Sequence, residues 1–502
     1  MFNKLKNLFK ESFIYSTGSL LVKLGGFIIM PLYIDFTTRE EFGLIMLFEV
    51  VFQFMQTISG WGLKGGFQRW YYDMKTEKAQ KSLFFTSFFM TIFTTLLATT
   101  AVFLVLNIFT FDIFKYQVSP KVILLFSSAA FLRMLLDIPF ILLRLQQKAA
   151  RQTFYQTFNI VITILVTYAT LRFLKLGLEG VYWGQLIANG LTFLVVIPII
   201  IRNSYLKFLK KTMFEMMRFG APLILSNVLT IVFSLSDRYI INIYKSLADV
   251  GSFSVAFKIA SIVQFVVLAP FFTSYSYDYY RYMNSPSKDR YYIKSFTYFI
   301  FLMSIAGIGI VLFSKEVIFV LAAGDSSFFE AIPLIPIMIL GIIFSGMRMV
   351  FTLPLQKAKR TRKISSVLIF TGVLNFGLNL LIIPYWGKIG AAITTVISQL
   401  TGAIWFYHII KKQENDTYEL VKIAKAILLA STIMYGYILL PKIHIVADYA
   451  IKIIAIPTFI LLMYWFRCFE SIELKKMLYA WKKWKDPRQW STHIKKLKKK
   501  QQ

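Results

Sequence analysis

The sequence predicts an all-α polytopic membrane protein with 14 transmembrane helices, built from two pseudo-symmetric six-helix lobes plus two C-terminal helices. Three observations predict this class. Hydrophobic residues make up 57% of the 502 residues, and the mean hydropathy is +0.61. Apolar runs of about 20 residues, long enough for a hydrocarbon core of ~30 Å, recur along nearly the whole chain. Basic residues concentrate in alternate loops, as the positive-inside rule requires.

The apolar run from Phe13 to Ile34 follows a short basic N-terminus. It is longer than the apolar core of a signal peptide, about 7–15 residues, and lacks a small-residue cleavage pattern, so we interpret it as the first permanent span. The predicted spans are 12–35, 42–63, 83–107, 119–143, 154–174, 181–201, 221–243, 250–274, 294–314, 331–353, 364–383, 388–408, 420–440 and 446–466.

The net charge of +31 would suggest nucleic-acid binding in a soluble protein. Here Lys and Arg alternate with the spans, so we interpret them as topology signals that place both termini in the cytoplasm, and expect no nucleic acid as partner. The segment 467–502 interleaves bases with Trp481, Trp484 and Trp490. It fits a helix on the anionic inner leaflet or, equally, a solvated basic tail that reinforces topology.

Composition also limits the chemistry. A single cysteine, Cys468, excludes an internal disulfide, and the three scattered histidines predict neither a metal centre nor a cofactor. The pattern G-x-x-x-x-G-K-[ST] is missing from the sequence, so ATP hydrolysis by this chain is not expected. The predicted extracytoplasmic loops are short for a membrane glycosyltransferase or polymerase, and we therefore expect a protein that is not an enzyme.

An internal duplication organises the chain. Gly43 and Tyr71 match Gly251 and Tyr279 at one constant spacing, and further on Gly177-x-x-Gly180 matches Gly387-x-x-Gly390 at a spacing only two residues longer. The repeat spans six predicted helices, an even number, so the halves are parallel, and transporter folds commonly bind substrate between such repeats. The predicted divisions are a lobe at 1–203, a cytoplasmic linker at 204–220, a second lobe at 221–412, helices 13 and 14 at 413–466, and a tail at 467–502.

Several segments resemble a known family. The N-terminal KESFIYSTGSLLVKLGGFIIMPLYIDFTTREEFGL, then GFQRWYYD, RFGAPLILSNVLTIVFSLSDRYII and VGSFSVAFKIAS together look like the Wzx-type polysaccharide or O-antigen flippases. The most specific pieces are Glu40 to Gly43, Ser236 to Ile241 and Gly251 to Lys258. These flippases belong to the MOP superfamily with MATE exporters and the lipid II flippase. The resemblance covers essentially the whole chain and implies a MATE-like fold in the bacterial cytoplasmic membrane.

We single out eight charged residues within the predicted spans, where an unpaired charge costs roughly 2.5–3.5 kcal/mol on insertion scales. They are Lys23, Glu49, Arg133, Asp137, Asp237, Arg238, Lys258 and Arg348. In the family that the chain resembles, the corresponding helices line a central cavity. By the repeat, Glu49 matches the position beside Lys258, and Asp137 the position beside Arg348. We predict that each acid approaches that base in one conformational state. Alternatively, Arg133 and Asp137 pair along one helix, and Arg238 extends to the membrane surface.

The resemblance implies an alternating-access flippase for an undecaprenyl-pyrophosphate-linked oligosaccharide used in cell-surface polysaccharide or lipopolysaccharide synthesis. We predict that Lys23, Arg133, Arg238, Lys258 and Arg348 contact phosphate or sugar. Glu49, Asp137 and Asp237 are candidates for coupling to H⁺ or Na⁺. Membrane lipids and polysaccharide-assembly proteins are the further expected partners. A lipid II-type flippase or a MATE-like drug antiporter is the alternative, and the excess of intramembrane bases argues against cationic drugs.

Overall fold

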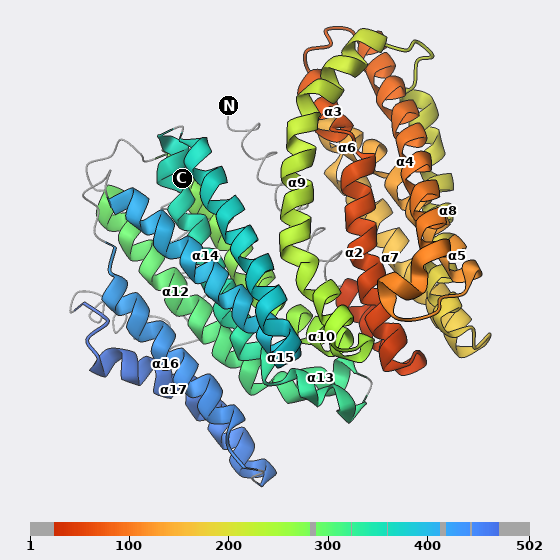
Figure 1. Ribbon diagram of the computed structural model, residues 1–502. Helices are drawn as coiled ribbons and strands as arrows, with labels where there is room; N and C mark the ends of the chain where they lie inside the picture. Colours follow the sequence, from red (N-terminus) through yellow and green to blue (C-terminus); the bar gives the residue numbers. More distant parts are fainter. Residues whose placement is uncertain are drawn as a thin grey trace, which may run out of the picture. The chain divides into compact units, whose positions relative to one another are not determined.

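A computed structural model describes residues 25–281, 288–322, 324–358, 360–411, 418–441 and 444–470, and Lys23 lies outside them. The described part is helical throughout, with short turns (Figure 1). A helical segment at Gly25–Phe36 comes first. The elements that follow are α2 (Arg39–Ser59), α3 (Leu63–Tyr71), α4 (Glu77–Phe114), α5 (Pro120–Leu135), α6 (Asp137–Leu145), α7 (Ala149–Arg172), α8 (Gly177–Asn203), α9 (Lys210–Tyr244), α10 (Leu247–Val263), the π-helix η1 (Gln264–Leu268), α11 (Ala269–Arg281), α12 (Lys288–Leu312), α13 (Ser314–Leu321), the 3-10 helix η2 (Ser326–Ala331), α14 (Leu334–Lys357), α15 (Thr361–Lys411), α16 (Leu420–Ile438) and α17 (Ile445–Trp465).

The polytopic all-α prediction is confirmed. Within the described residues, 11 helices are long and apolar enough to cross a membrane, and each predicted span coincides with helix over its described part. The count of 14 itself stays a prediction. Two predicted spans, 364–383 and 388–408, both lie in α15, whose backbone is not helical at Gly387, so α15 consists of two helices that meet at a kink. Another predicted span, 119–143, is divided between α5 and α6.

The break inside α15 lies at Gly387, whose φ of 52° and ψ of −135° are open to glycine and strained for other residues. Its repeat partner Gly177 also has a φ of 52°, at the start of α8. The two glycines that the sequence pairs therefore share a positive φ at the position that precedes a membrane span. This agreement supports the parallel duplication.

The chain divides into two compact units. The first comprises Met1–Tyr277 with Phe313–Glu414, and the second comprises Asp278–Leu312 with Asn415–Gln502. Contacts therefore group α12 with α16 and α17, not with the rest of its repeat. The predicted lobe boundaries stay a proposal.

In the first unit, α2 and α10 pack closely at their first turns. A Cβ at Gly43 would lie 1.9 Å from the Leu247 carbonyl oxygen, and one at Gly251 would lie 3.1 Å from Phe42. Gly43 and Gly251 are the pair that the repeat had matched, so the two halves meet through equivalent positions. Thr38 and Glu41 form a capping box that fixes where α2 begins. We call this end of the spans the Arg39 end.

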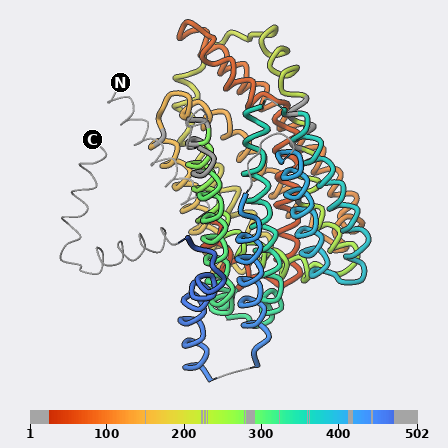
Figure 2. The backbone as a smooth tube through the Cα atoms, turned by 90° about the vertical axis from the view of Figure 1, so that its left-hand side faces the viewer, coloured from red at the N-terminus to blue at the C-terminus, as the bar shows by residue number. Residues whose placement is uncertain are grey.

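The second unit is held by charges near both ends of its helices. Lys294 Nζ on α12 lies 2.7 Å from Glu419 Oε1, just before α16. Figure 2 shows α16 and α17 running side by side. Lys452 on α17 has a fully buried side chain whose Nζ lies 2.7 Å from Asp448 Oδ2, and Tyr437 donates to Asp448 at 2.9 Å. The i, i+4 pair thus neutralises a lysine inside a predicted span.

Candidate substrate site inside the membrane spans

One face of α2 is polar although the helix is otherwise apolar. Glu49, Gln53 and Gln56 recur at i, i+4 and i+7, which places them on one side of the helix. Glu49 is exposed, so other described residues of the protein do not cover it. Because a charge facing lipid hydrocarbon is costly, this face of α2 must lie against water, substrate or other polar groups.

Asp137 is stabilised by residues of α2 and α3. Lys64 Nζ lies 2.5 Å from Asp137 Oδ2, and Gln56 Nε2 donates to both carboxylate oxygens at 3.2 and 3.4 Å. Leu136 separates α5 from α6, so Asp137 begins α6, where the positive helix terminus favours its charge. The interpretation in which Arg133 pairs with Asp137 along one helix is therefore wrong for this structure.

Arg133 instead lies over an aromatic ring. Its guanidinium carbon is 4.3 Å from the ring centroid of Phe52 on α2, a cation–π geometry. Glu49 and Arg133 both act electrostatically on the hydroxyl of Tyr33, to which Gln185 of α8 donates at 3.3 Å. The first half thus gathers Tyr33, Glu49, Arg133 and Gln185 around one region of the membrane interior.

Asp237 and Arg238 are packed inside the protein near the end of α9. Arg238 is only 7% exposed, so the interpretation in which it extends to the membrane surface is wrong. Its guanidinium lies 4.8 Å from the Phe257 ring, its Nε donates to Ser254 at 3.3 Å, and Nη1 lies 3.6 Å from Asp237 Oδ1. The desolvation cost of each charge is reduced by its neighbour in the sequence and by α10.

Lys258 on α10 connects the two groups. Glu49 and Arg238 are its electrostatic neighbours, with Glu49 of opposite charge. No ion pair within 4.0 Å joins Lys258 to Glu49 in the part of the chain that the structure describes, so their predicted pairing stays a prediction for another conformation. The partners of Asp137 are Lys64 and Gln56, and its predicted approach to Arg348 likewise stays a prediction.

Arg348 lies on α14, which packs against α10 and α15. Its side-chain carbons pack against Gly402 on α15, where a Cβ would lie 3.1 Å from Arg348 Cδ. It is half-buried on α14, on a face that also carries Ser345, Thr352 and Gln356. The structure therefore relates Glu49, Arg133, Asp237, Arg238 and Lys258 through electrostatic and aromatic neighbours, whereas Arg348 lies on the polar face of α14.

Sequence reasoning missed several residues that neighbour the intramembrane charges. Lys64 directly follows the predicted span 42–63 and was not among the intramembrane charges, and the amides Gln53, Gln56 and Gln185 carry no charge that would have marked them. A heptad-like recurrence of Gln after Glu49 on α2 was the available signal. Lys452 was also missed, although its position four residues after Asp448 in an apolar run indicates a pair.

The polar group is suited to binding, not to covalent chemistry. Guanidinium and ammonium groups donate hydrogen bonds to phosphate oxygens, and amides and carboxylates bind sugar hydroxyls. Among the described residues, no group of three or more His, Cys, Asp and Glu side chains is arranged to hold a metal ion. The arrangement provides cations, amides and aromatic rings on adjoining helices of one membrane-embedded unit.

The fold has solved counterparts. A structure described as the lipid II flippase MurJ in an inward closed conformation aligns with a TM-score of 0.73 at 14% identity, covering 90% of this chain and 99% of that one. An inward-facing multidrug resistance MATE family transporter of the MOP superfamily aligns with a TM-score of 0.62 at 15% identity, covering 79% and 95%. The MATE transporter VcmN of Vibrio cholerae aligns at 0.57 and 15%, covering 82% and 97%. No curated protein matches the sequence.

These features define a multi-pass membrane protein with a fold like that of the MurJ and MATE structures. A family model described as polysaccharide biosynthesis protein matches residues 8–276. The chain belongs to this polysaccharide biosynthesis family, and the family resemblance predicted from the sequence is confirmed.

Proposed function

We propose that this chain is a flippase that moves an undecaprenyl-pyrophosphate-linked oligosaccharide from the cytoplasmic to the outer leaflet of a bacterial cytoplasmic membrane. The observation that carries the proposal is the group of intramembrane bases, Arg133, Arg238 and Lys258, gathered with Glu49 and the amides of α2 in a chain of the polysaccharide biosynthesis family. An anionic headgroup can replace the acidic and aromatic partners of these bases.

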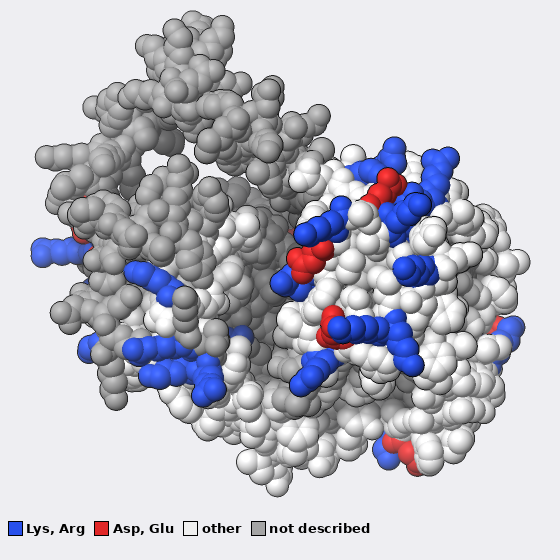
Figure 3. Space-filling model, turned by 90° about the horizontal axis from the view of Figure 1, so that it is seen from above, with Lys and Arg blue, Asp and Glu red and all other residues white. Residues whose placement is uncertain are grey.

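The membrane orientation is part of the proposal. Exposed bases gather on one face of the first half, at the end where α3 lies (Figure 3). They include Arg69, Lys75, Lys78, Arg144, Lys148, Arg151, Arg202, Lys210, Lys211 and Arg218. By the positive-inside rule this face is cytoplasmic, which makes the Arg39 end extracytoplasmic and places both termini in the cytoplasm.

In the proposed cycle, bases hold the pyrophosphate while Gln53, Gln56 and Gln185 donate to and accept from sugar hydroxyls. Lys23 and Arg348 complete the proposed substrate contacts. The lipid tail stays in the bilayer, so only the polar headgroup crosses. Protonation or Na⁺ binding at Glu49, Asp137 or Asp237 alters the pairing of nearby bases and drives the return step. Anionic inner-leaflet lipids and polysaccharide-assembly proteins are the proposed partners.

Translocation in reconstituted vesicles tests this function. The probe is undecaprenyl-pyrophosphate carrying a fluorescent sugar, and the readout is loss of accessibility to a membrane-impermeant quencher, with and without H⁺ or Na⁺ gradients. We expect the chain to translocate this probe, and Arg133→Gln and Lys258→Gln to lower the rate at least tenfold. Lys121→Gln, a base outside the site, serves as control.

The alternative substrates are separated by the same vesicles. Lipid II is the second candidate because the MurJ structure aligns over 90% of this chain. Faster movement of lipid II than of the oligosaccharide-linked lipid would select the lipid II function. Movement of neither lipid together with uptake of an organic cation would overturn the flippase proposal in favour of drug antiport.

A further inference from the structure

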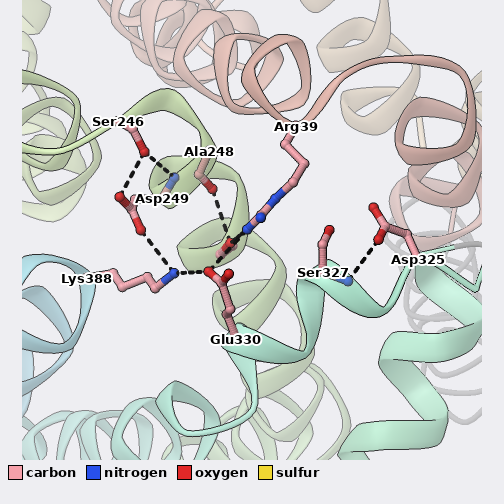
Figure 4. A network of polar contacts seen from close by, with 9 residues as sticks. Arg39, Ser246, Ala248, Asp249, Asp325, Ser327, Glu330 and Lys388 are labelled. Atoms are coloured by element: carbon pink, nitrogen blue, oxygen red, sulfur yellow. Dashed lines mark hydrogen bonds and ion pairs between the residues drawn. The ribbon is translucent and has the colours of Figure 1, made fainter.

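A cluster of four charged side chains joins the two halves of the repeat at the Arg39 end (Figure 4). Arg39 comes from the first turn of α2, Asp249 from α10, Glu330 from η2 and Lys388 from α15. Arg39 Nη2 lies 3.2 Å from Glu330 Oε2 and donates to Ser252 Oγ at 3.0 Å. We call Arg39, Asp249, Ser252, Glu330 and Lys388 the Arg39 network.

The two halves of the repeat contribute unequal numbers of charged side chains to the Arg39 network. Lys388 Nζ lies 2.7 Å from Glu330 Oε2 and 3.0 Å from Asp249 Oδ1, so three second-half charges already form a connected set. Ser246 donates to the other Asp249 oxygen at 2.8 Å. Only Arg39 belongs to the first half. If the halves separate here, Lys388 keeps both acidic partners, and only Arg39 must be solvated again.

Release of the Arg39 side chain from this network costs little. The Glu330 side chain is 53% exposed, so water screens its attraction to Arg39. The Nε of Arg39 is buried and has no hydrogen-bond partner among the described residues, and release would restore its hydration. Glu330 and Ser252 are thus positioned to bind the Arg39 guanidinium, and they bind it weakly enough for it to leave reversibly.

Backbone packing lies beside this network. Gly43 approaches the Leu247 carbonyl, and Gly251 faces Phe42 and the Arg39 carbonyl oxygen, so α2 and α10 have little space between them. The Arg39 guanidinium lies 5.4 Å from the ring centroid of Phe328, which in turn packs edge-on against Phe42 at 5.7 Å. Ion network, aromatic contact and glycine contact coincide at one point between the halves.

We propose that the Arg39 network is a one-sided latch that keeps the Arg39 end closed in this conformation and releases when Arg39 leaves Glu330 and Ser252. The second-half charges remain together in both states. The latch contributes only a small bias to the closed state, so that one substitution at Arg39 changes the population of open molecules without disturbing the second half.

The test measures distance across this end by paired spin labels. In a Cys468→Ser chain, labels at Asp35→Cys and Lys245→Cys report on the first and second halves, and both parent positions are exposed. We expect Arg39→Gln to raise the long-distance population up to about fivefold, the factor set by one exposed ion pair. Ser252→Ala, which removes one acceptor, should give a smaller rise in the same direction.

The matched control is Lys121→Gln. Lys121 on α5 pairs with Glu179 on α8 at 2.5 Å, an ion pair contained within the first half. The Lys121→Gln variant should leave the distances between the spin labels unchanged. The proposal is overturned if Arg39→Gln and Ser252→Ala leave the distance distribution as in the parent, or if Lys121→Gln changes it equally. Measurement in nanodiscs without sugar lipid or ion gradient keeps this result independent of the transported substrate.

Discussion

Each charge within the spans has its own means of stabilisation. Arg133 uses the Phe52 ring, Asp137 uses Lys64 and Gln56, and Arg238 uses Phe257 with its sequence neighbour Asp237. Aromatic faces and amides release a cation at lower cost than a close carboxylate, because they bear no opposite formal charge. Arg133, whose partner is the Phe52 ring, is therefore held in position while remaining able to exchange partners with an anionic ligand.

The Lys64–Asp137 pair predicts a stability effect. Lys64→Met leaves a partly buried carboxylate with Gln56 alone, and should lower the free energy of unfolding by about 1–3 kcal/mol. Thermal unfolding in detergent measures it. Arg69→Met is the control, because Arg69 and Asp73 form an exposed pair with 59% and 53% of their side chains accessible. Equal losses for both variants would show that burial of Asp137 contributes nothing.

Glu49 and Lys258 predict a transport effect. If they approach in another step of the cycle, Glu49→Lys and Lys258→Glu should each lower lipid translocation at least tenfold by placing like charges together. The double variant should recover part of that loss because opposite charges are restored. A double variant no faster than either single variant, with normal amounts in the membrane, would contradict this pairing.

Among the elements, α9 connects the two halves of the repeat. Its beginning packs on α3, and its end packs on α10 and α15 (Figure 1). Near the beginning, Gly220 approaches Gly62 so closely that a Cβ on Gly220 would lie 2.1 Å from the Gly62 Cα. This backbone contact leaves no flexible side chain to yield. The position of α9 on α3 therefore depends on two glycines at the crossing.

Gly220→Ala should force α9 away from α3 and lower the free energy of unfolding by about 1–3 kcal/mol. The measurement is the thermal unfolding midpoint. Gly377→Ala on α15 is matched to it, since a Cβ at Gly377 would meet nothing within 4 Å. That control should be neutral or stabilise by up to about 1 kcal/mol, as alanine favours helix. The same midpoint for both variants would contradict the close crossing.

At the scale of the molecule, the Arg39 network gives the closed end a defined pH response. Hydrogen bonds from Lys388 and Arg39 hold the pKa of Glu330 below its usual range, against a smaller effect of burial. Because its pKa is lowered, the ionised form of Glu330 stabilises the contact with Arg39 that closes this end. Its contribution is fully present above the usual carboxyl pKa and is lost as the pH falls through the lowered value.

The label distance across the Arg39 end should therefore stay constant from about pH 8 to about pH 5 and lengthen only at lower pH, beyond the usual Glu pKa of about 4.3. The charged groups facing Glu330 are Arg39 and Lys388, with Asp249 on the far side of Lys388. Glu330→Gln should abolish the response. A transition centred near neutral pH would assign it to another group.

Orientation is a second whole-molecule prediction. With Cys468→Ser as background, a cysteine at Glu40 should react with an impermeant maleimide added to intact cells, whereas one at Lys78 should react only after permeabilisation. Both positions are exposed, so reactivity reports the side of the membrane. The reverse pattern would invert the proposed topology and place the Arg39 network in the cytoplasm.

The sequence determined the features that depend on local pattern. Apolar run length predicted the helices, and basic loops predicted their alternation. The repeat in the sequence pairs Gly177 with Gly387, and in the structure both residues have a positive φ. Charges inside apolar runs identified Glu49, Arg133, Asp237, Arg238 and Lys258 as a candidate group, because a buried charge requires a partner wherever the chain provides one.

The tertiary structure decided which partner each charge has. Asp137 binds Lys64 from α3 and Gln56 from α2, whereas Arg133 lies over the Phe52 ring. In the sequence, Arg39, Asp249 and Glu330 lie in predicted loops and Lys388 begins a predicted span. Only the packing of α2, α10, η2 and α15 brings them together. The separation of these residues along the chain does not predict their contacts, because the contacts depend on how the helices cross in space.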